Sequence, residues 1–310
     1  MQKLIDINSY PVSVVLNSLL KDKTTGKNIV LATTTFMVNE EALKETEPIT
    51  IDLLRGMGAI VLQPRVVKSM EEQAQRTKSK AEVFTPSWIC NKMNNHCDEE
   101  WFGRPNVFNT ETENGWVTNP DPISFPEDRD WKKYIDSMRL EITCGEAPYL
   151  VSRYDTTTGE LIPVADRIGL LDRKLRVVGE NTNTREEWMK WAIRSYQSSY
   201  GYEYQGDNLL IGRINLLVTF VDYMEARWGE RPTDAELRKI ANIISWNLWQ
   251  MDGLTGMVPF AEQEVEFQQL SMFDFLAGEE SETKQMEAMP ARIYDWRSNE
   301  SVTYNSIKEK

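Results

Sequence analysis

The chain has 310 residues, of which 41% are hydrophobic and 27% are charged, so it can fold around one large or two modest cores. No apolar run approaches the roughly 20 residues of a membrane helix, and the first residues lack a secretory signal. We therefore expect a cytoplasmic protein without membrane contact. The net charge of −13, from 35 basic and 48 acidic residues, lacks the basic excess of a protein that binds nucleic acid unaided.

Cysteine and histidine are sparse. Cys90, Cys97 and Cys144 form no C-x-x-C pair, and His96 is the only histidine. This composition favours neither a disulfide scaffold nor a zinc site, and we expect no metal site. A lone histidine without a good nucleophile partner argues against a Ser/His or Cys/His hydrolase.

Residues 1–80 are interpreted as an N-terminal α+β extension. Short apolar stretches alternate with turns there, and the β-branched run NIVLATTTF (28–36) is typical of a strand. The stretch TTGK (24–27) lacks the G-x-x-x-x-G-K-[ST] spacing, so no phosphate-binding loop is predicted.

Residues 81–275 are interpreted as one domain in which strands alternate with helices, a pattern that favours a mainly parallel sheet. Thr85 is expected to cap a helix that begins near Pro86. We predict strands at 139–143, 200–204 and after residue 247, and helices at 184–199, at 208–228 and after a Thr233/Glu236 capping box.

Two further segments complete the expected organisation. An insertion at 101–132, rich in Pro, Asn and Gly, is predicted to be a long loop whose aromatic residues pack down. The tail, 276–310, holds one strand-like piece, ARIYDW (291–296), and the acidic run GEESE (278–282) is expected to be a solvated linker.

The expected ligand site lies at the carboxyl ends of the parallel strands, where open α/β sheets bind their ligands. Gly145 follows the first predicted strand and Glu203 ends the second. Their separation exceeds the roughly 20 residues of a dinucleotide fingerprint, so an ordinary strand–turn–helix stays open as the alternative. Asp252 can likewise begin a plain turn, Phe84 can pack beneath a helix, and Trp249 can be a core residue.

Four segments, in order, resemble the motifs of adenine-N6 DNA methyltransferases of restriction–modification systems. They are AEVFTPSWI (81–89), LEITCGEAPYL (140–150), YGYEYQGDNLLIGRINLL (200–217) and MDGL (251–254). The chain is also similar to small phage or mobile-element proteins that serve as modification subunits. The resemblance implies a Rossmann-like α/β methyltransferase sheet behind the N-terminal α+β extension, with S-adenosylmethionine as cofactor.

The resemblance also implies which residues contact the methionine and ribose parts of that cofactor. The methionine part would be touched by Phe84, Thr85 and Pro86. The amino acid and ribose would be lined by Cys144, Gly145 and Ala147. A sulfonium zwitterion carries no phosphate, so it needs fewer glycines and more carboxylates than a dinucleotide needs.

Carboxylates supply the remaining implied contacts. Glu141 would lie near the cofactor's amino group, Glu203 would accept the ribose hydroxyls, and Asp252 would receive the adenine amino group beside Leu254. The chain departs from the family at Glu141, where an aspartate is usual, and at Ala147, where a glycine is usual.

The catalytic tetrapeptide of the family, [DNS]-P-P-[YFW], is not evident after Asp252. Such a motif supplies hydrogen-bond acceptors and an aromatic ring for a flipped adenine. GMVPFAEQ (256–263) keeps Pro259 and Phe260, and NPDP (119–122) supplies Asn119 from the insertion. These three are the candidate catalytic residues.

Two functions remain open. The first is an S-adenosylmethionine-dependent adenine-specific DNA methyltransferase, or the cofactor-binding subunit of a modification system that reaches DNA with the help of a partner subunit. The second is a non-catalytic protein of a phage or mobile element that keeps the methyltransferase fold and binds a restriction or defence protein. If the chain does bind DNA, the first candidate patch comprises Arg65, Lys68, Arg76, Lys78 and Lys80.

Overall fold

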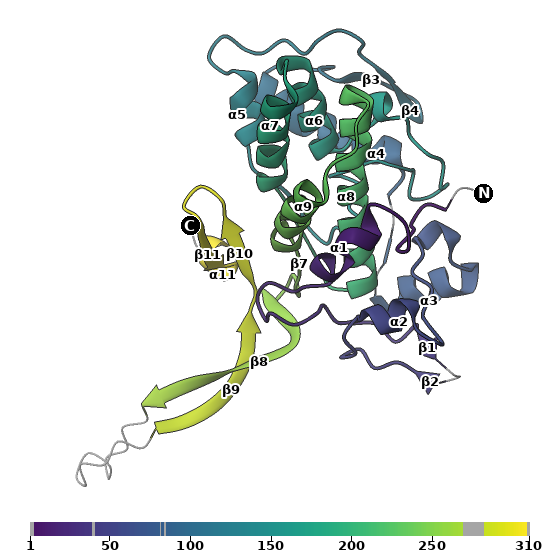
Figure 1. The fold of residues 1–310 in the computed structure, drawn as a ribbon, viewed down its shortest axis with the longest axis vertical. Coiled ribbons are helices and arrows are strands. Elements are labelled where there is room, and N and C mark those ends of the chain that lie inside the picture. The colour runs from purple at the N-terminus through teal and green to yellow at the C-terminus, as the bar shows by residue number, and fades with distance from the viewer. Residues whose placement is uncertain (1–2, 39–40, 81, 84, 269–281, 309–310) are drawn as a thin grey trace.

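A small parallel sheet lies at the centre of the fold. The computed structural model describes residues 3–38, 41–80, 82–83, 85–268 and 282–308 (Figure 1). The sheet has the order β5-β6-β7, and its parallel strands are β5 (Arg139–Glu141), β6 (Ser199–Glu203) and β7 (Leu248–Gln250). All three strands form where the sequence predicts them.

Two helices connect each strand to the next. They are α6 (Leu170–Asn181) and α7 (Arg185–Gln197), then α8 (Gly206–Trp228) and α9 (Asp234–Asn247). The Thr184 side chain accepts the Glu187 amide at the start of α7, and Thr233 and Glu236 form the predicted capping box of α9. The result is a mixed α/β fold, but the described strands do not make the full Rossmann-like sheet that we expected.

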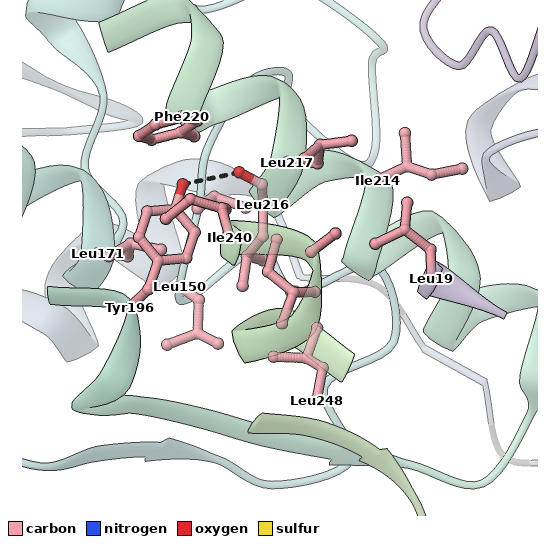
Figure 2. Packing of buried hydrophobic residues seen from close by; sticks show 14 of the residues in the cluster. Leu19, Leu150, Leu171, Tyr196, Ile214, Leu216, Leu217, Phe220, Ile240 and Leu248 are labelled. Atoms are coloured by element: carbon pink, nitrogen blue, oxygen red, sulfur yellow. Dashed lines mark hydrogen bonds between the residues drawn. The ribbon is translucent and has the colours of Figure 1, made fainter. Parts of the chain in front are cut away.

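One hydrophobic cluster fills the space between the sheet and these helices. It runs in sequence from Ile5 to Leu248 and includes α1 (Val12–Leu19) as well as α6 to α9. Figure 2 shows the packing, in which the buried Tyr196 hydroxyl donates to the Leu216 carbonyl at 2.7 Å. Residues from the N-terminal 80 therefore share the core of the later helices.

The C-terminal tail covers the other face of the sheet. β10 (Arg292–Asp295) and β11 (Glu300–Thr303) form a hairpin that is followed by α11 (Asn305–Lys308). A second hydrophobic cluster joins this tail to β6 and β7 and includes the buried Trp249 and Met251. Trp249 is thus a core residue.

The stretch 28–36, which we predicted as a strand, forms only two isolated bridges, from Asn28 to Lys21 and from Val30 to Pro48. The physical reason is that a side chain replaces the strand partner. The Gln250 side-chain amide donates to the Val30 carbonyl at 2.8 Å and accepts the Val30 amide at 2.9 Å. This side chain ends the sheet at β7, where a neighbouring backbone would otherwise continue it.

The other N-terminal elements are short. They are β1 (Met37–Val38), β2 (Glu41–Ala42), α2 (Ile51–Arg55), the 3-10 turn η1 (Arg65–Val67) and α3 (Met70–Lys80). β1 and β2 pair with each other and, among the described strands, with no other. Helix α4 (Ser87–Phe102) follows, and its cap differs from our expectation. Pro86 is the N-cap residue, and the Asp155 carboxylate, in place of Thr85, accepts the Ser87 amide at 2.7 Å.

The insertion at 101–132 contains a hairpin that we did not predict. β3 (Asn109–Thr112) pairs with β4 (Gly115–Thr118) across a two-residue turn. As expected, its aromatic residues pack down: Phe102 and Phe108 lie 6.0 Å apart by ring centroid, and both lie within 6 Å of Tyr134, just beyond the insertion. The segment ends at α5 (Trp131–Asp136), and the 3-10 turn η2 (Val164–Asp166) lies further along the chain.

A two-stranded arm projects from the body of the protein (Figure 1). It consists of β8 (Met257–Gln268) and β9 (Glu282–Pro290), which pair antiparallel. The acidic run at 278–282 lies outside the described residues except for Glu282. Among the helices of the described ranges, none is both long and apolar enough to cross a membrane.

Candidate functional site

A pocket of about 900 Å³ opens at the carboxyl ends of the parallel strands. Its walls are the turn after β5, the start of α8 after β6, the turn after β7, residues 82–85 and one side of α4. The structure thus places the pocket where ligands of open α/β sheets bind.

The pocket brings together residues that lie far apart in the sequence. Six residues predicted to contact a cofactor line it: Thr85, Glu141, Cys144, Gly145, Glu203 and Asp252. Pro86, Ala147 and Leu254 are not part of its lining, and the Leu254 side chain is 95% exposed. Phe84 lies outside the described residues.

The turn after β5 has a tightly coiled backbone. Thr143, Gly145 and Ala147 all have positive φ, at 45°, 53° and 64°. This left-handed region favours glycine, so Ala147 holds a backbone conformation that suits an alanine less well. A Cβ on Gly212 of α8 would lie 3.2 Å from the Gly145 carbonyl oxygen, which shows how closely this helix packs on the turn.

Glu141 is a buried carboxylate that holds the next part of the turn. Its two oxygens accept the amides of Tyr149 at 3.2 Å and Leu150 at 3.0 Å. Burial raises the pKa of the Glu141 carboxyl to about 8, although these two amides favour the charged form. The Glu141 side chain therefore fixes the backbone at residues 149 and 150, and it also lines the pocket as a titratable group.

Glu203 connects β6 to the same turn. Its carboxylate accepts the Gly145 amide at 2.9 Å and the Gln205 amide at 3.0 Å. Burial raises the pKa of Glu203, and the two amides oppose that shift. Each carboxylate oxygen retains acceptor capacity beyond one amide, so a ligand hydroxyl can still be bound here.

Asp252 organises the turn that follows β7. Its carboxylate accepts the Leu254 amide at 2.8 Å and the Thr255 amide at 3.3 Å, as in an Asx turn. A Cβ on Gly253 would lie 2.9 Å from the Tyr202 ring, so this glycine is required by close packing. Asp252 is a turn residue in the structure, and it also lines the pocket.

The pocket contains two buried acceptors that we did not predict. One Glu82 oxygen accepts bonds from Arg76, Asn208 and Gln205 at 2.7, 2.9 and 3.2 Å. Within the described residues, neither Glu82 Oε1 nor Gln205 Oε1 has a hydrogen-bond partner, although Arg65 Nε lies 3.9 Å from Glu82 Oε1. Glu82 could have been suspected from its place beside the FTP segment, but its partners are up to 126 residues away.

A buried ion network lies beneath this part of the pocket. Asp207, in the first turn of α8, pairs with Lys68 at 3.1 Å and with Arg76 at 3.0 Å. Burial by itself raises the pKa of Asp207, but the two cations outweigh it and hold that pKa below its usual value. The candidate DNA patch is therefore wrong for Lys68 and Arg76, which are 4% and 0% exposed and cannot reach a phosphate.

The charge of the pocket limits what it can bind. Four carboxyl groups line it, those of Glu82, Glu141, Glu203 and Asp252, and the residues described as its lining include no lysine or arginine. Phosphate sites in proteins use cations or rows of backbone amides. This pocket instead suits a ligand that carries hydrogen-bond donors, and a cationic ligand would pair with Glu141 once that carboxyl loses its proton.

The candidate catalytic residues do not line the pocket. The Asn119 side chain bonds within its own loop, to the Val107 carbonyl at 3.3 Å and the Asp121 amide at 3.1 Å. Pro259 is buried in β8. Phe260 is 50% exposed, and its ring centroid lies 6.5 Å from that of Tyr204, which lines the pocket. Phe260 is therefore a neighbour of the pocket wall.

No protein-family model, curated protein or solved structure matches this chain. The geometry and charge of the pocket are therefore the basis on which a function can be proposed.

Proposed function

We propose that the chain binds S-adenosylmethionine in this pocket and serves a DNA adenine-methylation system, as its methyltransferase or as its cofactor-binding subunit. One observation carries the proposal. Residues from all four segments that resemble methyltransferase motifs meet in a single pocket that is rich in carboxyl groups. An ordinary set of strand–turn–helix connections would not require these segments to share a ligand site.

The chemistry of the pocket suits this cofactor. Its sulfonium and ammonium groups are cationic, and its ribose and adenine offer hydrogen-bond donors. Glu203 would hold the ribose hydroxyls at the end of β6. Glu82 and Gln205 line the pocket, and each has one buried acceptor oxygen without a hydrogen-bond partner in the described part of the chain. A small rotation of either side chain would turn that oxygen toward an ammonium group or another donor.

The sheet supports the narrower role of a cofactor-binding subunit. In this proposal, β5, β6 and β7 represent one half of a Rossmann-like sheet. Among the described strands, β5 pairs only with β6, and its Leu140 side chain is 46% exposed. The neighbouring Ile142 side chain is 63% exposed. A partner subunit that supplies the catalytic residues would find an open sheet edge beside the pocket.

The same open edge supports the second candidate function. A protein that keeps the cofactor fold but lacks catalytic residues would bind a restriction or defence protein there and transfer no methyl group. A cofactor-binding measurement does not distinguish a subunit of a methylation system from a non-catalytic binding protein. A measurement of methyl transfer in the presence of partner subunits does distinguish them.

The first test is a calorimetric titration of the purified chain with S-adenosylmethionine, with circular dichroism to verify folding. We expect saturable binding with one site per chain. A folded protein that shows no binding at millimolar cofactor would refute the proposal.

A further inference from the structure

A groove of about 740 Å³ on the helical side of the protein has a charge opposite to that of the molecule as a whole. It lies over α5, α7 and α9, and α7 packs against both of the others. Five cationic side chains line it: Lys132, Lys133, Lys190, Arg194 and Lys239. We call this the basic groove.

Most of this positive charge is not neutralised by neighbours. Two carboxylates line the groove, and both are engaged. Asp130 caps α5 by accepting the Lys133 amide at 3.0 Å, and Asp136 is paired with Arg194 and Arg297. Within the described ranges, Lys132, Lys190 and Lys239 form no ion pair, and Lys133 donates to the Asp128 carbonyl at 2.8 Å.

Aromatic rings hold some of these cations in place. The Lys132 ammonium lies 5.6 Å from the ring centroids of both Trp131 and Trp191. The Lys190 ammonium lies 5.6 Å from the Trp191 ring on the same helix. Cation–π contacts of this kind favour a position for the ammonium over the ring while its other hydrogens stay free for a ligand.

The basic groove and the cofactor pocket lie at opposite ends of the sheet. α5 ends at Asp136, shortly before β5 begins, and α7 ends at Gln197, shortly before β6 begins. The groove therefore faces the amino ends of the strands, whereas the pocket opens at their carboxyl ends. A nucleotide bound in the groove itself therefore lies away from the pocket of the same molecule.

We propose that the basic groove binds the phosphodiester backbone of single-stranded nucleic acid at a second, non-catalytic site. The uncompensated lysines match the regular negative charge of a polynucleotide. Trp191 lines the groove as a half-buried ring that also packs edge-on against Trp131 at a centroid distance of 4.8 Å. Cations beside an aromatic ring are the combination that single-strand surfaces use for backbone and bases. An acidic protein segment would match the charge but would gain nothing specific from the ring.

The test measures fluorescence anisotropy of a labelled 20-nucleotide single strand with the full chain at 50 and 200 mM salt. Three to four phosphate contacts predict that affinity falls about 20- to 50-fold between these salt concentrations. The triple variant Lys132→Ala/Lys190→Ala/Lys239→Ala should weaken binding at least about tenfold at 50 mM salt and flatten the salt dependence. A matched control, Lys27→Ala/Lys44→Ala/Lys92→Ala, makes the same change of net charge at exposed lysines outside the groove.

Several results would overturn the assignment. If the control variant weakens binding as much as the groove variant, the effect belongs to net charge and not to this site. If polyglutamate of the same length binds as tightly and is lost in the same variant, the partner is an acidic protein. A duplex that binds better than the single strand would refute the single-strand preference. S-adenosylmethionine titrations of both variants keep this result separate from the proposed function, because neither triple changes the pocket.

Discussion

The Glu203 carboxylate accepts the Gly145 amide at 2.9 Å, so two residues that are 58 positions apart fix the end of β6 against the turn after β5. This bond connects the two segments that a cofactor would touch together. The carboxylate is buried and has a second amide partner in Gln205. It therefore shapes the pocket before any ligand arrives.

Replacing Glu203 tests whether this carboxylate also binds ligand. We expect Glu203→Gln to weaken S-adenosylmethionine binding by about 1.5–3 kcal/mol, because a hydrogen bond to a charged group is lost. Calorimetric titration measures the change. Glu262→Gln, on the exposed arm, is the matched control and should bind like the unaltered chain. Equal affinity in the two variants, with folding intact, would remove Glu203 from the site.

The raised pKa of Glu141 predicts that cofactor binding depends on pH. A cationic ligand pairs better with the ionised carboxylate, so binding should shift a pKa of about 8 downward and release a proton. Affinity should rise between pH 6.0 and pH 7.5, by about tenfold per unit at most, and level off near pH 8, where an α-amino group loses its own charge. Calorimetry in buffers of different ionisation enthalpy counts the protons released. In Glu141→Gln this release should fall, and unchanged release would exclude Glu141 as its source.

The same residue predicts a pH dependence of stability. Between about pH 4.5 and about pH 8 the folded chain holds a proton on Glu141 that the unfolded chain has lost. The contribution of Glu141 to the free energy of unfolding is therefore fully present below about pH 4.5 and declines as the pH rises toward about 8. Urea unfolding of the unaltered chain and of Glu141→Gln at pH 5.5 and 8.0 measures it. The loss of stability at the higher pH should be smaller in the variant.

Ligand charge gives a test that needs no mutation. S-adenosylhomocysteine lacks the sulfonium charge but keeps the ribose, adenine and amino acid. A pocket lined by carboxyl groups should bind S-adenosylmethionine about tenfold more tightly, a difference of about 1.4 kcal/mol. Competition between the two ligands measures the ratio. A preference for S-adenosylhomocysteine would show that the carboxyl groups do not interact with the sulfonium.

Local signals in the sequence predicted strands of the parallel sheet and several of the helices packed on it. The Thr233/Glu236 box marks the start of α9, and the strand-like run at 200–204 forms β6. The stretch 28–36 has an equally strong strand signal, but the Gln250 side chain takes the place of a paired backbone. Local strand propensity cannot predict that a side chain from a distant part of the sequence will pair with this backbone.

The arm shows a signal that we overlooked. Glu262 and Glu264 are exposed and alternate with the half-buried Ala261, Gln263 and Val265, which is the period of two expected of a strand. The resemblance to methyltransferase motifs identified pocket residues that lie near the ends of the strands. Glu82 was missed because its role depends on Arg76 and Asn208, which only the tertiary fold brings to it.

The ion network beneath the pocket predicts a large effect on stability. Arg76→Met removes one cation from between Asp207 and Glu82, and both carboxylates are buried. Breaking a buried pair leaves an uncompensated charge, so we expect a loss of about 3–5 kcal/mol in the free energy of unfolding by urea. Lys78→Met, at an exposed position of the same helix, should change it by less than about 0.5 kcal/mol.

The last prediction concerns methyl transfer. We expect little or no transfer to duplex DNA by the isolated chain, because the adenine amino nitrogen is a poor nucleophile. An enzyme must bind its hydrogens with acceptors and hold the flipped base against an aromatic ring. Within the described residues, neither Asn119 nor Phe260 lines the pocket. The acceptors and the aromatic ring that a flipped adenine requires are therefore not assembled there.

A tritium-transfer assay with and without the products of neighbouring genes measures this directly. Activity that appears only with a partner would support the role of a cofactor-binding subunit, with the catalytic residues supplied from the open side of β5. Robust transfer by the chain alone would contradict the prediction, and two variants would then locate the chemistry. Loss of activity in Asn119→Ala with cofactor binding retained would require the insertion to move to the pocket. Loss in Phe260→Ala would instead assign the aromatic role to the residue that already lies beside Tyr204.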